Sequence, residues 1–391
     1  MRILHTSDWH LGKRLEGQSR VGEQRKFIDT LGAIVSNEKI DLVLVAGDIF
    51  DTYNPSAEAE TLFFDSLKIL SNNGRVGVII IPGNHDNPQR LCAISNIAKD
   101  LGVIIYERAF QEIPVGDYGS FSITKSTAGG IEIQKDEKSI FVYSLPFPSE
   151  ATLNESFDNI KFNDRIKEIL EEGVIQNNKD IPTVVMTHIY VAGSMGDNES
   201  ESLELGGAKA ISINDLPNVS YIALGHVHRP MHFKDKNAYY SGSPIEYRVT
   251  ENKFNKKVYI VDFINNDTVV QDVAIDNYKP IKEYTVNGAE EAIEKSIFLK
   301  DHNEWIYLKI ILDEPLTNSQ IRKIKSNKNI VEIIPIVNSQ TEAVDDINYS
   351  EENIQEAFIE FFKEESNGME PTQEIKNLFL ELIEEENHET N

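Results

Sequence analysis

Side chains that can bind metal ions recur along the first 230 residues, each time directly after a short apolar run. Five runs end in this way, and the residues that follow them are Asp8, His10, Asp48, Asn84, His85, Asp86, His188, His226 and His228. A short apolar run without helical periodicity is typical of a buried strand. Because parallel strands of an α/β fold end at one edge of the sheet, these side chains are expected to meet there. The sequence therefore predicts a metal site.

The residue types favour two divalent cations. Two ions about 3.5–4 Å apart need a shared ligand, and a carboxylate can bridge them through its two oxygens. Histidine and asparagine are neutral, so they complete the coordination without adding negative charge around an incoming phosphate. A set of His, Asp and Asn suits Mn²⁺, Fe²⁺ or Zn²⁺, whereas Ca²⁺ prefers oxygen ligands alone. The lack of cysteine among these residues argues against a structural zinc site.

Each motif taken alone also has an ordinary structural explanation. An Asp-x-His pair such as Asp8 and His10 arises by chance, and Gly47-Asp48 is also a common turn. An asparagine after a strand can cap a helix. A histidine in the core can have a purely structural role, through the hydrogen bonds that it forms. The conjunction of all five motifs favours the metal site. His5 is expected to point into the sheet, and the histidines interpreted as structural or surface residues are His232, His302 and His388.

The elements that carry the first motifs are predicted to follow a β-α-β-α-β order. They are strands at residues 3–7, 42–47 and 78–82, with amphipathic helices at 21–37, 57–73 and 88–101. This alternation favours parallel pairing with right-handed crossovers.

Beyond residue 121 the pattern changes to short strands separated by turns. A helix is expected at 151–173, and the later site-bearing strands at 184–187 and 221–225. The run of strands that follows, to about residue 275, is predicted to be antiparallel.

A second pattern begins near residue 277, where the metal-binding residue types end. It consists of strands at 281–286, 305–312 and 330–337 and helices at 288–299 and 317–326. We interpret it as a compact βαββ or split βαβ unit. The predicted domains are therefore residues 1–276, 277–340 and 345–391, the last being a helical tail.

The tail shows the clearest helical periodicity of the chain. Apolar residues recur at i, i+3, i+4, i+7 and i+8 in two stripes, and the candidate partner-binding residues among them are Ile354, Phe358, Phe361, Phe362, Ile375, Leu378, Phe379 and Leu382. An amphipathic helix is stable only when its apolar face is covered, so the stripes pack either on this chain or on a partner. We favour a partner, because the segment from 345 to 391 carries 15 Asp and Glu against two Lys.

Composition is that of a globular protein of two or three domains. Of its 391 residues, 40% are hydrophobic and 26% charged. No apolar run approaches the roughly 20 residues that cross a bilayer, and no signal peptide is expected. The single Cys92 fits a reducing, cytoplasmic environment. The formal net charge of −26 disfavours free-standing nucleic-acid binding, because phosphate contacts need Lys and Arg.

The ordered motifs resemble those of the calcineurin-like metallophosphoesterase superfamily. They are Asp8-x-His10, Gly47-Asp48, Gly83-Asn84-His85-Asp86, Thr187-His188 and Gly225-His226-x-His228. Residues 5–12, 47–51 and 201–207 resemble the SbcD nuclease family within it, whose layout also has a small second domain and a helical tail. Serine/threonine phosphatases of the superfamily usually have Asp-Arg-Gly after the Gly-Asp and then Asn-His-Glu. This chain has Phe50-Asp51-Thr52 and Asn84-His85-Asp86 instead.

The resemblance implies an α/β fold with a two-sheet β-sandwich flanked by helices, a small α+β capping domain and the helical tail. It also implies two metal ions, with Mn²⁺ expected. One would be held by Asp8, His10, Asp48 and His228, and the other by Asp48, Asn84, His188 and His226. His85 would stabilise the phosphorus centre and protonate the leaving oxygen, with Asp86 orienting its ring.

The implied activity is that of an Mn²⁺-dependent DNA nuclease subunit in repair, recombination and replication. The family degrades double-stranded ends from 3′ to 5′ and cuts single strands and hairpins. It works with an SbcC-type coiled-coil ATPase in a two-plus-two complex, so a homodimer is expected and the tail would grip the partner's coiled coil. Basic residues that would hold the DNA backbone, or would only be solvated loop charges, are Lys13, Arg14, Arg20, Arg25, Arg90, Arg229 and Arg248.

Two other functions are left open by the sequence. The first is a metallophosphoesterase that acts on small phosphodiesters or phosphoproteins, which cleavage of a DNA hairpin would exclude. The second is a non-catalytic docking subunit of an ATPase complex. The complete set of candidate ligands argues against the second, because a chain without catalysis has no need of a bridging aspartate.

Overall fold

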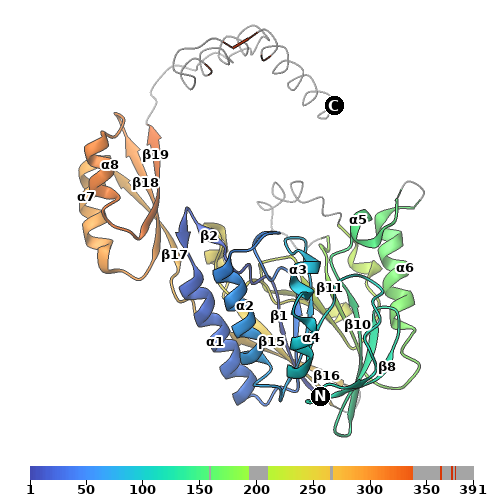
Figure 1. Cartoon of the computed structure of the whole chain (residues 1–391). Coiled ribbons are helices and arrows are strands. Elements are labelled where there is room, and N and C mark those ends of the chain that lie inside the picture. The colour runs from blue at the N-terminus through green and yellow to red at the C-terminus, as the bar shows by residue number, and fades with distance from the viewer. Residues whose placement is uncertain are drawn as a thin grey trace. The chain divides into compact units, whose positions relative to one another are not determined.

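The computed structural model describes residues 1–157, 160–192, 210–264 and 267–337, together with residues 362, 371, 372 and 375. Met1–Val337 forms one compact unit (Figure 1). The predicted tail, apart from those four single positions, lies outside the described residues, as does the segment at 201–207. Within the described part of the chain, no helix is long and apolar enough to cross a bilayer.

The first sheet has six strands and carries the amino-terminal motifs. In order across the sheet the strands are β16 (Asp267–Ala274), β15 (Lys257–Ile264), β1 (Arg2–Thr6), β4 (Leu42–Ala46), β5 (Gly77–Ile81) and β6 (Val103–Ile105). The strands β1, β4 and β5 are parallel, as predicted, and β6, which was not predicted, is parallel to β5. Strand β15 is antiparallel to both β1 and β16. The carboxyl ends of β1, β4 and β5 therefore lie at one edge.

The second sheet has eight strands and carries the later motifs. In order they are β13 (Met231–Phe233), β14 (Ala238–Tyr240), β12 (Tyr221–Gly225), β11 (Thr183–His188), β10 (Lys138–Leu145), β9 (Gly130–Lys135), β8 (Ser122–Ser126) and β7 (Gly116–Asp117). The strands β10, β11, β12 and β14 are parallel, and the outer ones are antiparallel. The prediction that all strands after the second histidine pair are antiparallel is wrong for β14.

Side chains of the central strands alternate between two hydrophobic layers. In β4, Leu42 and Leu44 pack with residues of the second sheet such as Met186, whereas Val43 and Val45 pack with the helices. Those helices are α1 (Val21–Asn37) and α2 (Ala57–Leu70), which cover the outer face of the first sheet (Figure 1). Helix α6 (Phe162–Val174) packs against the outer face of the second sheet. The result is a helix–sheet–sheet–helix sandwich.

The predicted helices are confirmed in part. Helix α1 has the predicted bounds. The predicted helix at 88–101 is instead divided into α3 (Pro88–Cys92), α4 (Ser95–Ala98) and a 3-10 turn (Lys99–Leu101), because the backbone at Ile94 leaves the helical conformation. The predicted helix at 151–173 begins as α5 (Glu150–Leu153), which Asn154 ends in the left-handed conformation before α6 starts.

The region predicted as a capping domain contains a third sheet. Its order is β17 (Ile281–Asn287), β18 (Trp305–Leu312) and β19 (Ile330–Val337), joined by α7 (Gly288–Phe298) and α8 (Asn318–Ile324). All three strands are parallel, so the expected βαββ or split βαβ unit of α+β type is wrong. A helix follows each of the first two strands and returns the chain to the same end of the sheet, which makes the unit βαβαβ.

The third sheet is joined to the first domain by a buried contact. Leu15, at the end of the hairpin β2 (Arg14–Leu15) and β3 (Gln18–Ser19), packs in one cluster with Ile281 and Trp305. The indole nitrogen of Trp305 donates to Glu23 Oε1 at 2.8 Å, and the amide of Ile281 donates to a Glu246 carboxylate oxygen at 2.8 Å.

Candidate metal centre

The nine predicted site residues converge where the two sheets end. Those of the first sheet follow β1, β4 and β5, and those of the second lie at the ends of β11 and β12. In β11 and β12 the register pairs His188 with Gly225, so the turn that begins at His226 starts beside His188. Strands that are far apart in the sequence thus deliver these side chains to one place.

Asp48 lies between two groups of imidazoles. Its Oδ2 is 3.5 Å from His10 Nε2 and 3.4 Å from His188 Nε2. Its other oxygen, Oδ1, accepts the backbone amide of His85 at 3.0 Å. One carboxylate oxygen therefore faces ring nitrogens from both sheets.

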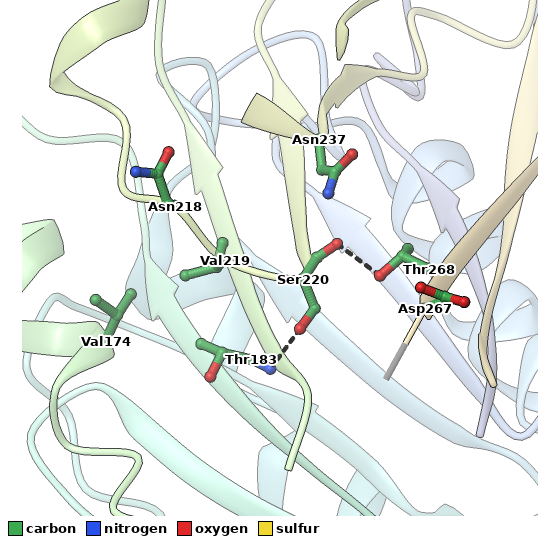
Figure 2. Close-up of a pocket in the computed structure, with 8 residues that line it drawn as sticks. All are labelled: Val174, Thr183, Asn218, Val219, Ser220, Asn237, Asp267 and Thr268. Carbon is green, nitrogen blue, oxygen red and sulfur yellow. Dashed lines mark hydrogen bonds between the residues drawn. The ribbon is translucent and has the colours of Figure 1, made fainter. Parts of the chain in front are cut away.

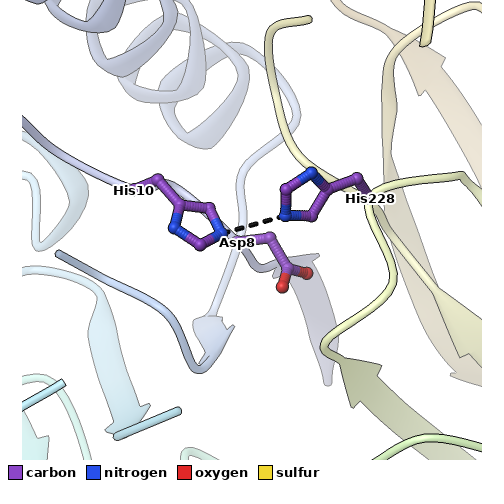
Figure 3. A group of neighbouring side chains, drawn as sticks. All are labelled: Asp8, His10 and His228. Atoms are coloured by element: carbon purple, nitrogen blue, oxygen red, sulfur yellow. Dashed lines mark hydrogen bonds between the residues drawn. The ribbon is translucent and has the colours of Figure 1, made fainter. Parts of the chain in front are cut away.

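The first group of candidate ligands contains Asp8, His10 and His228 (Figure 3). Their ligand atoms all lie within 4.8 Å of one another, and the two Nε2 atoms are 2.9 Å apart. Asp8 is held from two sides, because its Oδ1 accepts the amide of His226 at 2.9 Å and its Oδ2 accepts the Ser7 hydroxyl.

The second group contains Asn84, His188 and His226. Asn84 Oδ1 lies 3.1 Å from His188 Nε2 and 3.0 Å from His226 Nδ1, and the two ring nitrogens are 3.3 Å apart. The ligand atoms of Asp8, Asp48 and His188 also lie within 4.8 Å of one another. The two groups are therefore adjacent, with Asp48 common to both.

Hydrogen bonds behind two rings fix which nitrogen faces the centre. His188 Nδ1 lies 2.8 Å from the carbonyl oxygen of Ala46, and His228 Nδ1 lies 3.0 Å from Glu251 Oε1. A carbonyl or carboxylate oxygen only accepts, so each Nδ1 carries the hydrogen. In the neutral form of each ring, Nε2 presents a lone pair toward the centre, and that is the form a metal ligand must take.

The backbone is strained where it presents these side chains. Asp8, His10, Asp48 and His226 have positive φ of 54°, 45°, 51° and 107°. Such conformations cost about 1–3 kcal/mol each and are enriched at functional sites. Close approach is possible because glycine precedes two of these turns: an added Cβ at Gly225 would lie 1.7 Å from the carbonyl oxygen of Ala46.

The centre carries negative charge that the described lysine and arginine residues do not neutralise, as a site for cations requires. Asp8 and Asp48 are buried, and no lysine or arginine of the described residues forms an ion pair with either. Burial would raise the pKa of Asp48, but His188 and His10 hold it well below its usual value. Burial lowers the pKa of His188, yet Asp48 raises it to about 9. Burial lowers the pKa of His10 to about 4 and that of His226 to about 3, so these rings are neutral.

These observations test whether the residues fit divalent metal ions. Two buried carboxylates, one amide oxygen and several imidazole nitrogens converge, and no lysine or arginine of the described residues forms an ion pair with the carboxylates. The Nδ1 atom of the buried His10 has no hydrogen-bond partner and lies 3.5 Å from Asp51 Oδ1. The donor set matches Mn²⁺, Fe²⁺ or Zn²⁺. Such cations would supply the opposite charge that two buried carboxylates require.

His85 stands apart from the two groups. Its Nδ1 lies 2.8 Å from the carbonyl oxygen of Asp51, and its ring is half-buried, edge to face with His10 at 4.8 Å between centroids. The prediction that Asp86 orients this ring is wrong. The Asp86 carboxylate instead accepts the backbone amides of Ile49, Phe50 and Gly83 at 2.8–3.0 Å. Asp86 thus holds the loops that carry Asp48 and His85.

The candidate DNA-contacting residues divide by burial. The prediction is wrong for Arg20, which is buried against Glu23 at 2.5 Å and donates to the Glu246 carbonyl oxygen at 2.8 Å. Three others form ion pairs: Lys13 with Asp51 at 2.6 Å, Arg25 with Asp65 at 3.0 Å and Arg90 with Glu60 at 2.6 Å. The exposed remainder are Arg14, Arg229 and Arg248.

Three residues that touch the centre were not predicted from the sequence. Asp51 contacts His10, Lys13 and His85, and it ends the Gly47-Asp48-Ile49-Phe50-Asp51 segment, three residues after Asp48, so spacing was a usable signal. The ring centroids of Tyr247 and His10 are 5.6 Å apart, and the Glu251 carboxylate binds the His228 ring. Neither belongs to a local motif.

A separate polar cavity of about 720 Å³ lies at the opposite ends of β11 and β12, where those strands begin. There the Ser220 hydroxyl accepts the Thr183 amide and the Ser220 carbonyl accepts the Thr268 hydroxyl (Figure 2). None of the candidate ligands lines it.

Comparison with known proteins identifies the fold family. The model of the calcineurin-like phosphoesterase family matches residues 1–230, which include all nine predicted site residues.

Three curated relatives are named as the SbcD subunit of the SbcCD nuclease. The protein of Bacillus subtilis is 36% identical, with 99% of each chain covered. The protein of Staphylococcus epidermidis is 24% identical over 93% of each chain. The protein of Rhodobacter capsulatus is 32% identical, covering 67% of this chain and 66% of its own.

Proposed function

We propose a function from the following premise: this chain belongs to the calcineurin-like phosphoesterase family, and within it to the SbcD group of SbcCD nuclease subunits. We infer that it is the nuclease subunit of an SbcCD-type complex and hydrolyses DNA phosphodiester bonds in repair and recombination. The observation that carries this proposal is the position of Asp48 Oδ2 between His10 Nε2 and His188 Nε2. A shared carboxylate is what a two-metal phosphoesterase requires.

The proposed ligand sets follow the two groups of side chains. Asp8, His10 and His228 would hold one ion and Asn84, His188 and His226 the other, with Asp48 shared between them. Bound divalent ions would lower the pKa of water and neutralise the charge of a phosphodiester. We propose Mn²⁺ as the metal, supported by the mixed oxygen and nitrogen donors.

His85 is proposed to act on the phosphodiester. The carbonyl of Asp51 fixes the hydrogen on Nδ1, which leaves Nε2 as the nitrogen that can carry a second proton. From there the ring would protonate the leaving oxygen of the cut strand, as a general acid. Because Asp86 binds backbone amides, its proposed role is to hold the Asp48 and His85 loops in register.

Cleavage of DNA also requires contacts to its backbone. Lys13 lies beside the centre, paired with Asp51, and Arg14, Arg229 and Arg248 are exposed. We propose these four for backbone contacts, together with Arg90, which is partly neutralised by Glu60. The net charge of −26 means that such contacts are local. A partner that supplies further basic surface would complete DNA binding.

The partner is proposed to be an SbcC-type coiled-coil ATPase. The relatives' name places them in the SbcCD complex, and the two apolar stripes of the tail would bind this partner in helix-in-groove fashion. A homodimer within a two-plus-two complex is part of the proposal. So are 3′-to-5′ degradation of double-stranded ends and cutting of single strands and hairpins. These finer points rest on the family resemblance.

A reconstitution experiment tests the proposed function. The full chain is mixed with its ATPase partner, Mn²⁺, ATP and a labelled DNA hairpin, and bis-p-nitrophenyl phosphate serves as a small phosphodiester in parallel. The expected result is hairpin cutting that requires the partner and is lost in Asp48→Asn. Hydrolysis of the small substrate alone would point to a general phosphodiesterase instead. Absence of both activities, with metal bound, would favour a docking role without catalysis.

A further inference from the structure

The ring of His228 is held from behind by a buried carboxylate far along the chain. Glu251 is 2% exposed and belongs to the 3-10 turn Val249–Lys253, which follows no recognised motif. Its Oε1 lies 3.0 Å from His228 Nδ1. Its Oε2 accepts the backbone amide of Tyr247 at 3.3 Å and the Ser243 hydroxyl at 3.3 Å.

The same carboxylate is paired with a buried lysine. Lys256 is 3% exposed, and its ammonium lies 2.5 Å from Glu251 Oε2. The ammonium also donates to the backbone carbonyl of His228 at 3.2 Å and to Ser243 Oγ at 2.8 Å. The pair therefore holds His228 at two points, its ring through Glu251 and its main chain through Lys256.

Burying an ion pair in a protein core carries a large desolvation penalty. Removing both charges from water costs several kcal/mol per ion, and apolar residues of similar volume often replace such pairs without loss of stability. Apart from each other and from His228, the two side chains form hydrogen bonds only with Ser243 and Tyr247 among the described residues, and both lie in the same loop. The contacts of the ion pair outside this loop therefore all hold His228 in place.

We propose that Glu251, anchored by Lys256, is the positioning residue that keeps His228 in the Nδ1–H tautomer with Nε2 free for a metal ion. The proposal rests on the two-metal site put forward above and adds a residue that no motif marks. It assigns the pair to one ion only. The ring of His188 has its own acceptor, the carbonyl oxygen of Ala46, and does not depend on Glu251.

Glu251→Gln distinguishes positioning from bulk packing. In this variant the positive charge of Lys256 is expected to attract the oxygen of the new side-chain amide. The NH₂ group of that amide then faces His228 Nδ1. Two donors cannot face each other, and the ring is expected to move its hydrogen to Nε2, the nitrogen that should bind metal. The tautomer is read in the metal-free, full-length protein from long-range ¹H–¹⁵N spectra of ring-labelled histidine, with His228 assigned by His228→Gln.

The second readout is Mn²⁺ binding by calorimetry. Loss of the partner behind a metal-bound histidine typically weakens metal binding 10–100-fold, so one of two ions is expected to weaken by about that factor while the other is retained. Glu132→Gln is the matched control. Glu132 is 4% exposed and accepts from Lys179 at 2.6 Å and Thr124 at 2.7 Å, without touching a candidate ligand. It should leave both ions and the His228 tautomer unchanged.

Glu251→Asp covers the case in which the glutamine variant does not fold. It keeps the charge for Lys256 but withdraws the acceptor by one methylene, so a mixture of His228 tautomers and a weakened ion are expected. A folded variant with the wild-type tautomer and both ions at wild-type affinity would overturn the proposal. Equal loss of both ions with a lowered melting temperature in both variants would overturn it too, because it indicates a structural role. If the wild-type protein binds no ion, the proposed two-metal function is wrong. The tautomer of His228 in the metal-free variants then still tests the positioning role of Glu251.

Discussion

Asp48 has to satisfy several structural constraints at once. It is buried, has a positive φ of 51°, and presents one oxygen to His10 and His188 while the other binds the His85 amide. An asparagine has nearly the same shape but carries no charge and only one acceptor oxygen. The charge and the second oxygen can therefore be removed together without changing the volume of the side chain.

Asp48→Asn is expected to abolish hydrolysis and to reduce bound Mn²⁺ to one ion or none, with the fold intact. The reason is that the only shared ligand of the two proposed sites is lost. A hydrolysis assay measures activity, metal content after dialysis measures bound Mn²⁺, and circular dichroism checks the fold. Full activity in this variant, or in the wild type with excess chelator, would rule out the two-metal account.

His85→Ala separates a proton donor from a metal ligand. The ring lies beside His10 but is bound through Nδ1 to the Asp51 carbonyl. The turnover rate is expected to fall about 10²–10⁴-fold, the usual contribution of a general acid. Two Mn²⁺ per chain should still bind by calorimetry. If the variant loses an ion, His85 is a ligand and its proposed role is incorrect.

At the residue scale, sequence reasoning succeeded where a local pattern existed. Side chains that follow apolar strands were predicted to meet, because parallel strands share an edge. It failed where the partner lies far along the chain. Arg20 looks like any loop arginine until the distant Glu246 carbonyl, which accepts from it, is taken into account. Asp86 likewise needs the amides of Ile49 and Phe50 to explain it.

Strands β4, β11 and β12 form the scaffold on which the centre depends. The strand ends are closer than side chains normally allow, since the Gly225 position is in contact with the Ala46 carbonyl. That carbonyl also fixes the His188 tautomer. Gly225 thus permits the close approach of the two sheets, and the Ala46 carbonyl that it contacts orients a candidate ligand.

Gly225→Ala is expected to destabilise the fold by about 1–3 kcal/mol, the usual cost of overpacking, because its Cβ would lie 1.7 Å from the Ala46 carbonyl oxygen. Denaturant unfolding measures the change. Gly22→Ala in α1 is the control, since nothing lies within 4 Å of its added Cβ. The control should be neutral or stabilise by up to about 1 kcal/mol. Equal stability of the two variants would contradict the close approach.

At the element scale, periodicity predicted most helices and strands but not their interruptions. The pattern from 151 to 173 is continuous in the sequence, yet Asn154 adopts φ 54° and ends α5. The third sheet shows a different limit. Its strands and helices were placed nearly correctly, but strand direction depends on where each helix returns the chain, which hydrophobic pattern does not record.

The whole molecule combines a nuclease-type domain with an attached parallel sheet. Hydrogen bonds from Trp305 to Glu23 and from Ile281 to Glu246 join them, and Arg20 links both acidic residues. Arg20 is therefore part of the join between the domains. The two stripes of the tail, by contrast, are understood only from sequence.

Deletion of residues 349–391 tests the proposed role of the tail. The truncated chain retains the whole of Met1–Val337, so it should stay folded and bind metal as the full chain does. It should no longer co-purify with the ATPase partner. Full partner binding by the truncated chain would show that the stripes are not the docking element. Unfolding of the truncated chain would show that they belong to its core.

Anomalous diffraction from crystals grown with Mn²⁺ tests the central claim most directly. The two-metal account predicts two Mn²⁺ peaks per chain, about 3.5–4 Å apart, with the Asp48 carboxylate between them. Asp8, His10 and His228 should surround one peak, and Asn84, His188 and His226 the other. A single peak, or two peaks without Asp48 between them, would contradict the account.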